Sequence, residues 1–149
     1  MQKSFDTTFE TYEVIGEPLG EGGAGRVYRV KNSGNEHFAL KCLSPERITT
    51  EKRKRFKNEI AFCTTCQHQN IVRVIDHGFV SIDGIKCPFY VMPLFPMTLR
   101  KLMGEGVSAE KVLPLFTQIL QGIDAAHKSK AIHRDLKPEN ILYDPTKDL

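Results

Sequence analysis

His133-Arg134-Asp135-Leu136-Lys137-Pro138-Glu139-Asn140 is the stretch that decides the fold of this chain. It puts an aspartate, a lysine and an asparagine at fixed offsets on one short segment. The φ angle of Pro138 is locked at about −65°, which stiffens the segment between the lysine and the asparagine. Phosphoryl transfer needs such a set: a carboxylate that accepts a hydroxyl proton, a cation that meets the γ-phosphate, and an amide oxygen that holds a metal ion.

This run resembles the catalytic loop of protein kinases. Lys137, two positions after Asp135, is similar to the lysine of the serine/threonine-specific branch, because tyrosine kinases usually place alanine or arginine near there. Arg134 is unlike small-molecule phosphotransferases, which usually carry glycine before the aspartate. The resemblance implies that Asp135 orients and deprotonates the substrate hydroxyl, that Lys137 neutralises charge on the transferring phosphoryl group, and that Asn140 binds a magnesium ion.

The sequence ends at Leu149, nine residues after Asn140. Protein kinases place an Asp-Phe-Gly segment shortly after that asparagine, and its aspartate binds the catalytic magnesium. No such segment occurs in these 149 residues. The resemblance therefore predicts a kinase truncated after its catalytic loop, with an incomplete helical lobe. We expect this chain alone to be inactive.

The composition is that of a globular protein, with 40% hydrophobic and 26% charged residues. The formal net charge of +3 is too small an excess to indicate a nucleic-acid partner. No apolar run approaches the roughly 18 residues that a membrane-spanning helix needs. The first eleven residues contain charges and only isolated Phe5 and Phe9, so they lack the apolar core of a signal peptide. These features predict a cytoplasmic protein without a membrane partner.

Two local clusters allow a second interpretation. Cys63-Thr64-Thr65-Cys66 with nearby His68 has the spacing of a zinc or redox site, but no second pair completes a tetrahedral set, which favours reduced thiols. The basic run from Lys52 to Lys57 is typical of a nuclear-localisation or nucleic-acid patch. Since Phe56 and Glu59 already define the inward side of that segment, we favour a solvated helix face.

Hydrophobic periodicity predicts strands, then one helix, then two more strands, a hinge and a second helix. The helix at 108–128 carries an apolar stripe that includes Val112, Leu115, Phe116, Ile119 and Ile123. The predicted strands cover 12–19, 26–30, 36–43, 71–79 and 87–92, and the predicted helices cover 50–66 and 108–128.

Two charged residues fall on apolar faces of these elements. Alternation in the third strand puts Lys41 on the same face as Ala39 and Leu43. In the following helix Glu59 lies three positions after Phe56, on the inward stripe. A charge on an apolar face is costly unless it is paired, so the two residues are candidates for a functional ion pair.

The segment Gly20-Glu21-Gly22-Gly23-Ala24-Gly25-Arg26-Val27 matches Gly-x-Gly-x-x-Gly-x-Val. A dinucleotide-binding loop shares these glycines, but there they open a helix, whereas here Arg-Val-Tyr-Arg-Val and a turn follow. The glycines therefore cap a hairpin. A hairpin tip without Cβ atoms allows phosphates to approach the backbone closely.

The kinase resemblance gives each of these residues a role in binding ATP. It implies that Gly20, Gly22 and Gly25 cover the phosphates, and that Val27 and Ala39 pack on the adenine. It also implies that Lys41 contacts the α- and β-phosphates and that Glu59 holds Lys41 in place. Met92 would lie at the back of the adenine pocket, and Phe95 would supply the hinge N–H, because Pro93 has none.

The sequence thus predicts an α+β, protein-kinase-like fold: a five-stranded antiparallel amino-terminal lobe with one inserted helix, and an incomplete helical lobe. The resemblance covers Tyr12 to Leu149. The expected divisions are an extension at 1–11, the amino-terminal lobe at 12–92, a hinge at 93–98 and the partial carboxy-terminal lobe at 99–149.

The predicted function is ATP- and Mg²⁺-dependent phosphorylation of serine or threonine hydroxyls of a protein substrate, in the intact enzyme. The alternative is an inactive kinase-like module that binds nucleotide or a partner protein. A small-molecule phosphotransferase is a third interpretation, against which Arg134 and Lys137 argue. A second polypeptide could also cover the apolar stripe of the helix at 108–128.

Overall fold

The computed structural model describes residues 2–22, 25–131 and 136–147. These residues form two compact units. The first comprises Met1–Thr65 and Val72–Leu94, and the second comprises Cys66–Ile71 and Phe95–Leu149. The chain passes between the units after Thr65, after Ile71 and after Leu94, and the hinge expected at 93–98 stays a prediction.

The first unit is built on a seven-stranded sheet in which every described pairing is antiparallel. The strand order is β1-β2-β4-β5-β7-β6, and β3 pairs with β4 off this path. Short turns join β1 to β2, β4 to β5 and β6 to β7, as is usual for antiparallel pairs. The strands are β1 (Ser4–Asp6), β2 (Thr11–Val14), β3 (Gly20–Gly22), β4 (Gly25–Lys31), β5 (His37–Cys42), β6 (Asp76–Ile82) and β7 (Ile85–Pro93).

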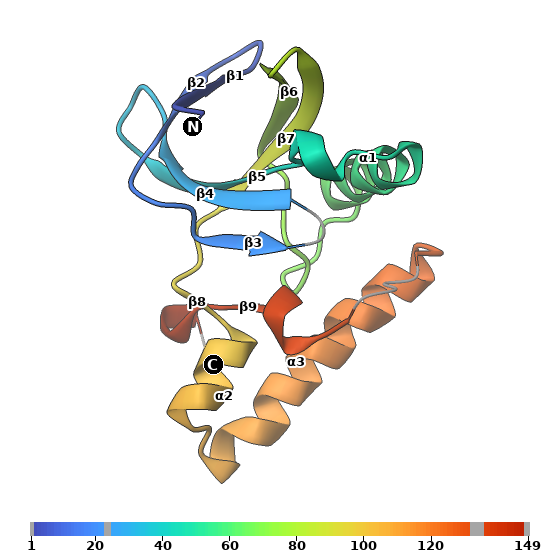
Figure 1. The fold of residues 1–149 in the computed structure, drawn as a ribbon. Helices are drawn as coiled ribbons and strands as arrows, with labels where there is room; N and C mark the ends of the chain where they lie inside the picture. Colours follow the sequence, from blue (N-terminus) through green and yellow to red (C-terminus); the bar gives the residue numbers. More distant parts are fainter. Residues whose placement is uncertain (1, 23–24, 132–135, 148–149) are drawn as a thin grey trace. The chain divides into compact units, whose positions relative to one another are not determined.

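The amino-terminal segment is part of this sheet, although the sequence suggested an extension ending at residue 11. β1 pairs with β2, and Phe5 is completely buried. The two ends of the strand order approach one another, since the Oδ2 atom of Asp76 on β6 accepts hydrogen bonds from Thr7 and Tyr12. The sheet consequently curls around its core, as Figure 1 shows.

The core lies inside the curled sheet. The ring of Phe5 packs edge-on against that of Phe89, with 5.1 Å between the centroids, and Tyr28 lies beside it. Alternation along each strand sends every second side chain inward, as expected for an antiparallel sheet. The core cluster consists of Phe5, Tyr12, Tyr28, Val30, Leu40, Cys42, Cys87, Phe89 and Val91.

The predicted α+β class and kinase-like architecture are confirmed, with more strands than the five expected. The first expected strand, 12–19, ends at Val14, before Gly16 with its φ of 68°, and β3 begins only at Gly20. β1 is the other addition. The short 3₁₀ helix η1 (Pro45–Arg47) precedes helix α1 (Thr50–Thr65). Helix α1 ends one residue before the predicted end at 66.

The second unit contains helices α2 (Leu99–Glu105) and α3 (Ala109–Lys128). A two-stranded sheet pairs β8 (Met97–Thr98) with β9 (Leu142–Tyr143), flanked by the 3₁₀ helices η2 (Pro138–Asn140) and η3 (Pro145–Lys147). The segment 66–71 belongs here because Asn70 closely approaches α3. A Cβ on Gly122 would lie 2.8 Å from the Asn70 carbonyl oxygen, so only glycine fits there without a shift.

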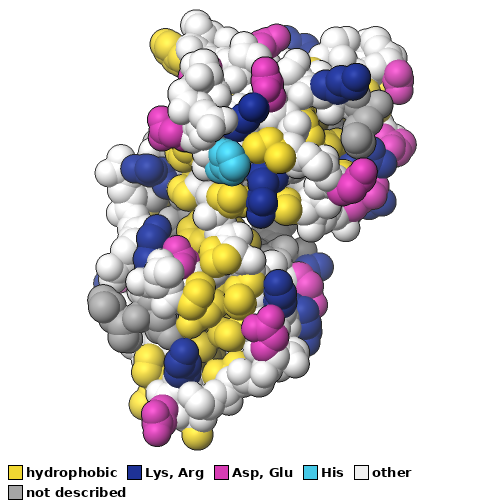
Figure 2. Space-filling model, turned by 90° about the vertical axis from the view of Figure 1, so that its left-hand side faces the viewer, with side chains coloured by type: hydrophobic (Ala, Val, Ile, Leu, Met, Phe, Trp, Pro, Cys, Tyr) yellow, Lys and Arg dark blue, Asp and Glu magenta, His cyan; other side chains and the backbone are white. Residues whose placement is uncertain are grey.

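The apolar stripe of α3 is only partly covered. Leu115, Ile119 and Ile123 are half-buried, whereas Val112 and Phe116 are 54% and 56% exposed. Figure 2 shows hydrophobic side chains gathered on one face of this unit. Among the described residues, no helix is both long and apolar enough to cross a membrane.

Candidate active site

The predicted glycine loop is a hairpin, as the residues after it suggested. β3 and β4 pair Gly20 with Val27 and Gly22 with Gly25. Gly25 has a φ of 116°, and a Cβ on it would lie 2.1 Å from the carbonyl oxygen of Cys42. Packing of the fold therefore requires glycine at this position.

Gly20 and Gly22 are different, because nothing lies within 4 Å of a Cβ built on either. Neither has the positive φ that favours glycine. The fold itself therefore does not demand glycine at these two positions. Close approach of another molecule to the backbone would explain them, and this is how a glycine loop accommodates phosphates.

Strand register brings four of the nine predicted nucleotide-binding residues onto one face of the sheet. Val27 lies opposite Lys41, and Ala39 lies opposite Met92. Because directly opposed residues of antiparallel strands point to the same side, these four side chains share a face. Tyr90 shares it too, because it lies opposite Lys41. Ala39 and Met92 are both buried, which makes this part of the face apolar.

Helix α1 supplies the partner of Lys41. The Lys41 Nζ lies 3.2 Å from the Oε1 of Glu59, so the expected ion pair is present although its members are 18 positions apart in sequence. Phe56, one turn earlier, is buried and packs on the Tyr90 ring at 5.2 Å between centroids. This contact fixes the rotation of α1 that points Glu59 towards Lys41.

Tyr90 is a member of the site that sequence reasoning missed. Its hydroxyl donates to the Oε1 of Glu59 at 2.5 Å, and the Lys41 Nζ lies 5.7 Å from its ring centroid. Burial, followed by the nearby Glu59 charge, raises the pKa of Tyr90 well above its ordinary value, so the hydroxyl stays protonated as a donor. The signal was its position two residues before Met92, since period-two alternation puts both on one face.

The hinge residues fall in different units. Met92 is near the end of β7 and 6% exposed, whereas Phe95 belongs to the second unit and is partly buried. The Lys147 Nζ lies 5.8 Å from the Phe95 ring centroid.

The carboxy-terminal part of the catalytic loop is described, and its conformation follows from Pro138. Lys137 is extended, with a φ of −153°, as expected for a residue before proline. The following residues form η2, in which the Asn140 N–H donates to the Lys137 carbonyl at 2.9 Å. Lys137 and Asn140 are both exposed, as a substrate or metal contact requires.

Neighbouring elements of the second unit hold η2 in place. The Arg100 Nε on α2 lies 2.7 Å from the Oε1 of Glu139. This guanidinium lowers the pKa of the Glu139 carboxyl. The Leu99 N–H also donates to the Ile141 carbonyl at 2.7 Å. Asp135, with His133 and Arg134, lies outside the described residues.

The other cluster suggested by the sequence gains no metal geometry. None of the four cysteines forms a disulfide in the structure. Within residues 2–22, 25–131 and 136–147, no group of three or more His, Cys, Asp or Glu side chains could hold a metal ion. Burial raises the pKa of Cys42 to about 12, so this thiol is unreactive near neutral pH.

Comparisons with known proteins agree with this geometry. The chain is 32% identical over 152 residues to serine/threonine-protein kinase A of Synechocystis, covering 88% of this chain and 27% of the relative. It is 31% identical over 133 residues to serine/threonine-protein kinase PksC of Streptomyces coelicolor, covering 83% and 24%. It is 32% identical over 143 residues to CBL-interacting protein kinase 26 of rice, covering 94% and 28%.

The chain thus spans about a quarter of the length of these relatives. A family comparison covers nearly the whole of this chain, because the protein kinase domain matches residues 12–149. With the glycine hairpin and the Lys41–Glu59 pair, this match establishes the assignment: the chain belongs to the protein kinase family.

Proposed function

We propose that this chain is the nucleotide-binding and catalytic-loop part of a serine/threonine protein kinase. The observation that carries the proposal is the Lys41–Glu59 ion pair on a sheet face shared with Val27, Ala39 and Met92. A lysine held by a carboxylate beside an apolar surface suits a ligand that has phosphates at one end and a flat aromatic base at the other.

Each residue then has a defined contribution to binding ATP. The open backbone at Gly20 and Gly22 receives the phosphates, and the Lys41 ammonium binds two of them. Glu59 and the Tyr90 hydroxyl hold that ammonium in position, since the Lys41 side chain is 20% exposed and points to the shared Glu59 oxygen. Val27, Ala39 and Met92 contact the adenine.

The catalytic-loop residues serve the transfer itself. Asp135 accepts the proton of the attacking serine or threonine hydroxyl, and Lys137 balances charge on the phosphoryl group. Asn140 would hold Mg²⁺, because a carboxamide oxygen is a hard ligand of the kind that this ion prefers. When bound, Mg²⁺ neutralises charge on the phosphates.

Nucleotide titration tests the proposal directly. A fluorescent ATP analogue should bind the wild-type chain, and Lys41→Ala should weaken binding by about tenfold to a hundredfold, the value of a charged hydrogen-bonded contact. Lys31→Ala is the matched control, since Lys31 is a strand lysine of β4 that pairs with the exposed Glu13. Equal affinity of wild type and Lys41→Ala would remove Lys41 from the site.

The alternative, an inactive nucleotide-binding module, is the behaviour we expect of these 149 residues by themselves. The family pattern holds magnesium with a second residue, the aspartate of Asp-Phe-Gly, which this sequence does not contain. Radiolabel transfer from ATP to a generic protein substrate should therefore stay at background. Transfer that Asp135→Asn abolishes would show that the polypeptide is a complete catalyst.

A further inference from the structure

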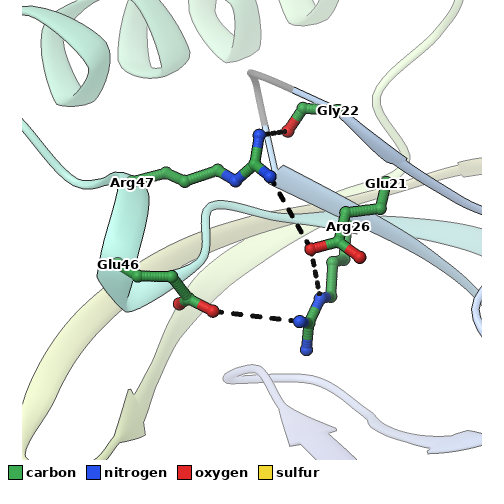
Figure 3. Close-up of polar contacts among 5 residues, drawn as sticks. All are labelled: Glu21, Gly22, Arg26, Glu46 and Arg47. Atoms are coloured by element: carbon green, nitrogen blue, oxygen red, sulfur yellow. Dashed lines mark hydrogen bonds and ion pairs between the residues drawn. The ribbon is translucent and has the colours of Figure 1, made fainter.

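Arg47 lies outside every motif considered so far, yet it reaches the glycine hairpin. Its Nη1 donates to the carbonyl oxygen of Gly22 at 2.7 Å, and its Nη2 lies 3.9 Å from the Oε1 of Glu21 (Figure 3). Both partners belong to β3, in the part of the hairpin whose glycines have open space around them. A single guanidinium therefore engages two consecutive residues of the loop.

Glu21 is shared with a second arginine. Arg26 lies opposite Glu21 in the β3–β4 ladder, and its Nε is 3.1 Å from the same Oε1 atom. That N–H is not aligned for a hydrogen bond, so the contact is an ion pair. The Arg26 Nη2 lies 3.8 Å from the Oε1 of Glu46 on η1. Charges thus alternate along Glu46, Arg26, Glu21 and Arg47, as Figure 3 shows.

Both ends of this chain of charges, Glu46 and Arg47, lie on η1, which is rigid. Ser44, before η1, is only 5% exposed, and Pro45 begins η1 with a fixed φ. The Arg47 N–H donates to the Ser44 carbonyl at 3.0 Å, which closes the turn. By contrast, Gly20 and Gly22 have no side chains that could pack and position β3. The ion-pair chain supplies the restraint that the glycines lack.

We infer that Arg47 is a positioning residue that, together with Glu21, sets the backbone orientation of the glycine hairpin for the phosphate part of the nucleotide. A hydrogen bond to the Gly22 carbonyl restrains the orientation of the backbone at the end of β3. Main-chain groups are what a glycine loop offers to phosphates, so their orientation decides phosphate affinity. This inference rests on the proposed nucleotide site.

The exposure of the Arg47 and Glu21 side chains limits how much the loss of Arg47 can change nucleotide affinity. Arg47 and Glu21 are 37% and 46% exposed, so solvent and salt screen their attraction. An exposed ion-pair network of this kind changes an equilibrium by about twofold to fivefold, and less at high salt. The loss should be confined to ligands that carry phosphates.

The experiment compares Arg47→Met, Arg47→Lys, Arg73→Met, Lys41→Ala and the wild type. Methionine keeps the apolar length of arginine but removes the charge and the donors, and Arg73 is an exposed arginine of the first unit, between α1 and β6, without a described side-chain contact. Affinities for a fluorescent ATP analogue and, by displacement, for adenosine are measured at low and high salt. Arg47→Met should lose about twofold to fivefold for the ATP analogue at low salt, little at high salt, and nothing for adenosine. Arg73→Met should match the wild type, and Arg47→Lys should be intermediate, because one ammonium cannot reproduce the two contacts.

The other outcomes separate the two proposals. No binding by the wild type, or Lys41→Ala equal to it, overturns the nucleotide site and this inference with it. A weakened Lys41→Ala beside an unchanged Arg47→Met overturns the role of Arg47 alone. Equal losses for the ATP analogue and adenosine in Arg47→Met mean that Arg47 only stabilises the unit, which also overturns the inference.

Discussion

The two units of this chain differ in how completely they bury their apolar side chains. In the described residues, every buried hydrophobic side chain except Tyr143 belongs to the first unit. The second unit exposes Met103, Val112, Leu113, Phe116 and Leu120 to at least 48%. Burial of each such side chain is worth about 1.5–3 kcal/mol, so the units have very different reserves of stability.

This difference separates the two halves of the proposed chemistry. The Lys41 face lies on a sheet that curls around its own core, so these 149 residues are sufficient to form it. The described catalytic-loop residues Lys137 and Asn140 lie at the short η2, in a unit whose longest helix, α3, has a partly uncovered apolar stripe. A partner polypeptide covering that stripe, as the sequence suggested, remains a prediction.

The largest expected difference in stability comes from truncating one phenylalanine in each unit. Phe89→Ala should cost about 3–5 kcal/mol in the first unit, because the side chain is fully buried against Phe5. Phe116→Ala, 56% exposed on α3, should cost about 0.5 kcal/mol or less. Hydrogen exchange gives a local opening free energy for each unit. Similar losses in the two variants would mean that α3 has a core that this structure does not contain.

Replacing one glycine in each unit should change the local opening free energy in opposite directions. Gly25→Ala should lower the opening free energy of the first unit by about 1–3 kcal/mol, because φ is 116° and the Cβ would collide with the Cys42 carbonyl. Gly104→Ala should stabilise α2 by about 0.5–1 kcal/mol, since its Cβ meets open space in a helix. Exchange rates of β4 and α2 amides measure both. A neutral Gly25→Ala would contradict the hairpin register.

The third test compares one polar contact from each unit. Tyr90→Phe removes the donor to Glu59 in a buried setting and should cost about 1 kcal/mol of local stability. Arg100→Gln removes an exposed ion pair and should leave unfolding unchanged within error. Urea unfolding monitored by exchange in each unit provides the readout. A costly Arg100→Gln would show that η2 depends on this pair for its conformation.

The smallest test is the titration of Glu139. Its hydrogen bond from Arg100 lowers its pKa in the folded chain, so the pair contributes stability above the ordinary glutamate pKa and loses that contribution as pH falls through the lowered value. NMR should follow this titration below the ordinary range, and Arg100→Gln should return the pKa upwards. An unchanged pKa in that variant would assign the shift to another group.

Much of the first unit follows from sequence pattern. Alternation in the strand at 37–42 puts Lys41 on the same face as Ala39, and helical spacing puts Glu59 on the inward side with Phe56. The structure contains both arrangements, and they bring Lys41 and Glu59 together. The pattern was less informative at 71–79, where β6 begins only at Asp76. Residues 66–71 join the second unit instead, and their contact with Gly122 is too remote in sequence to be read from local periodicity.

The sequence alone determined the kinase family, the glycine hairpin and the identity of the charged residues, because motif spacing and side-chain alternation are local properties of the chain. Only the tertiary structure showed that Phe5 completes the core, that Tyr90 shares the Glu59 oxygen with Lys41, and that Arg47 reaches Gly22. Each of these contacts joins residues 18 or more positions apart through the curl of the sheet or the path of η1. Such contacts depend on how the elements pack together, which local sequence pattern does not encode.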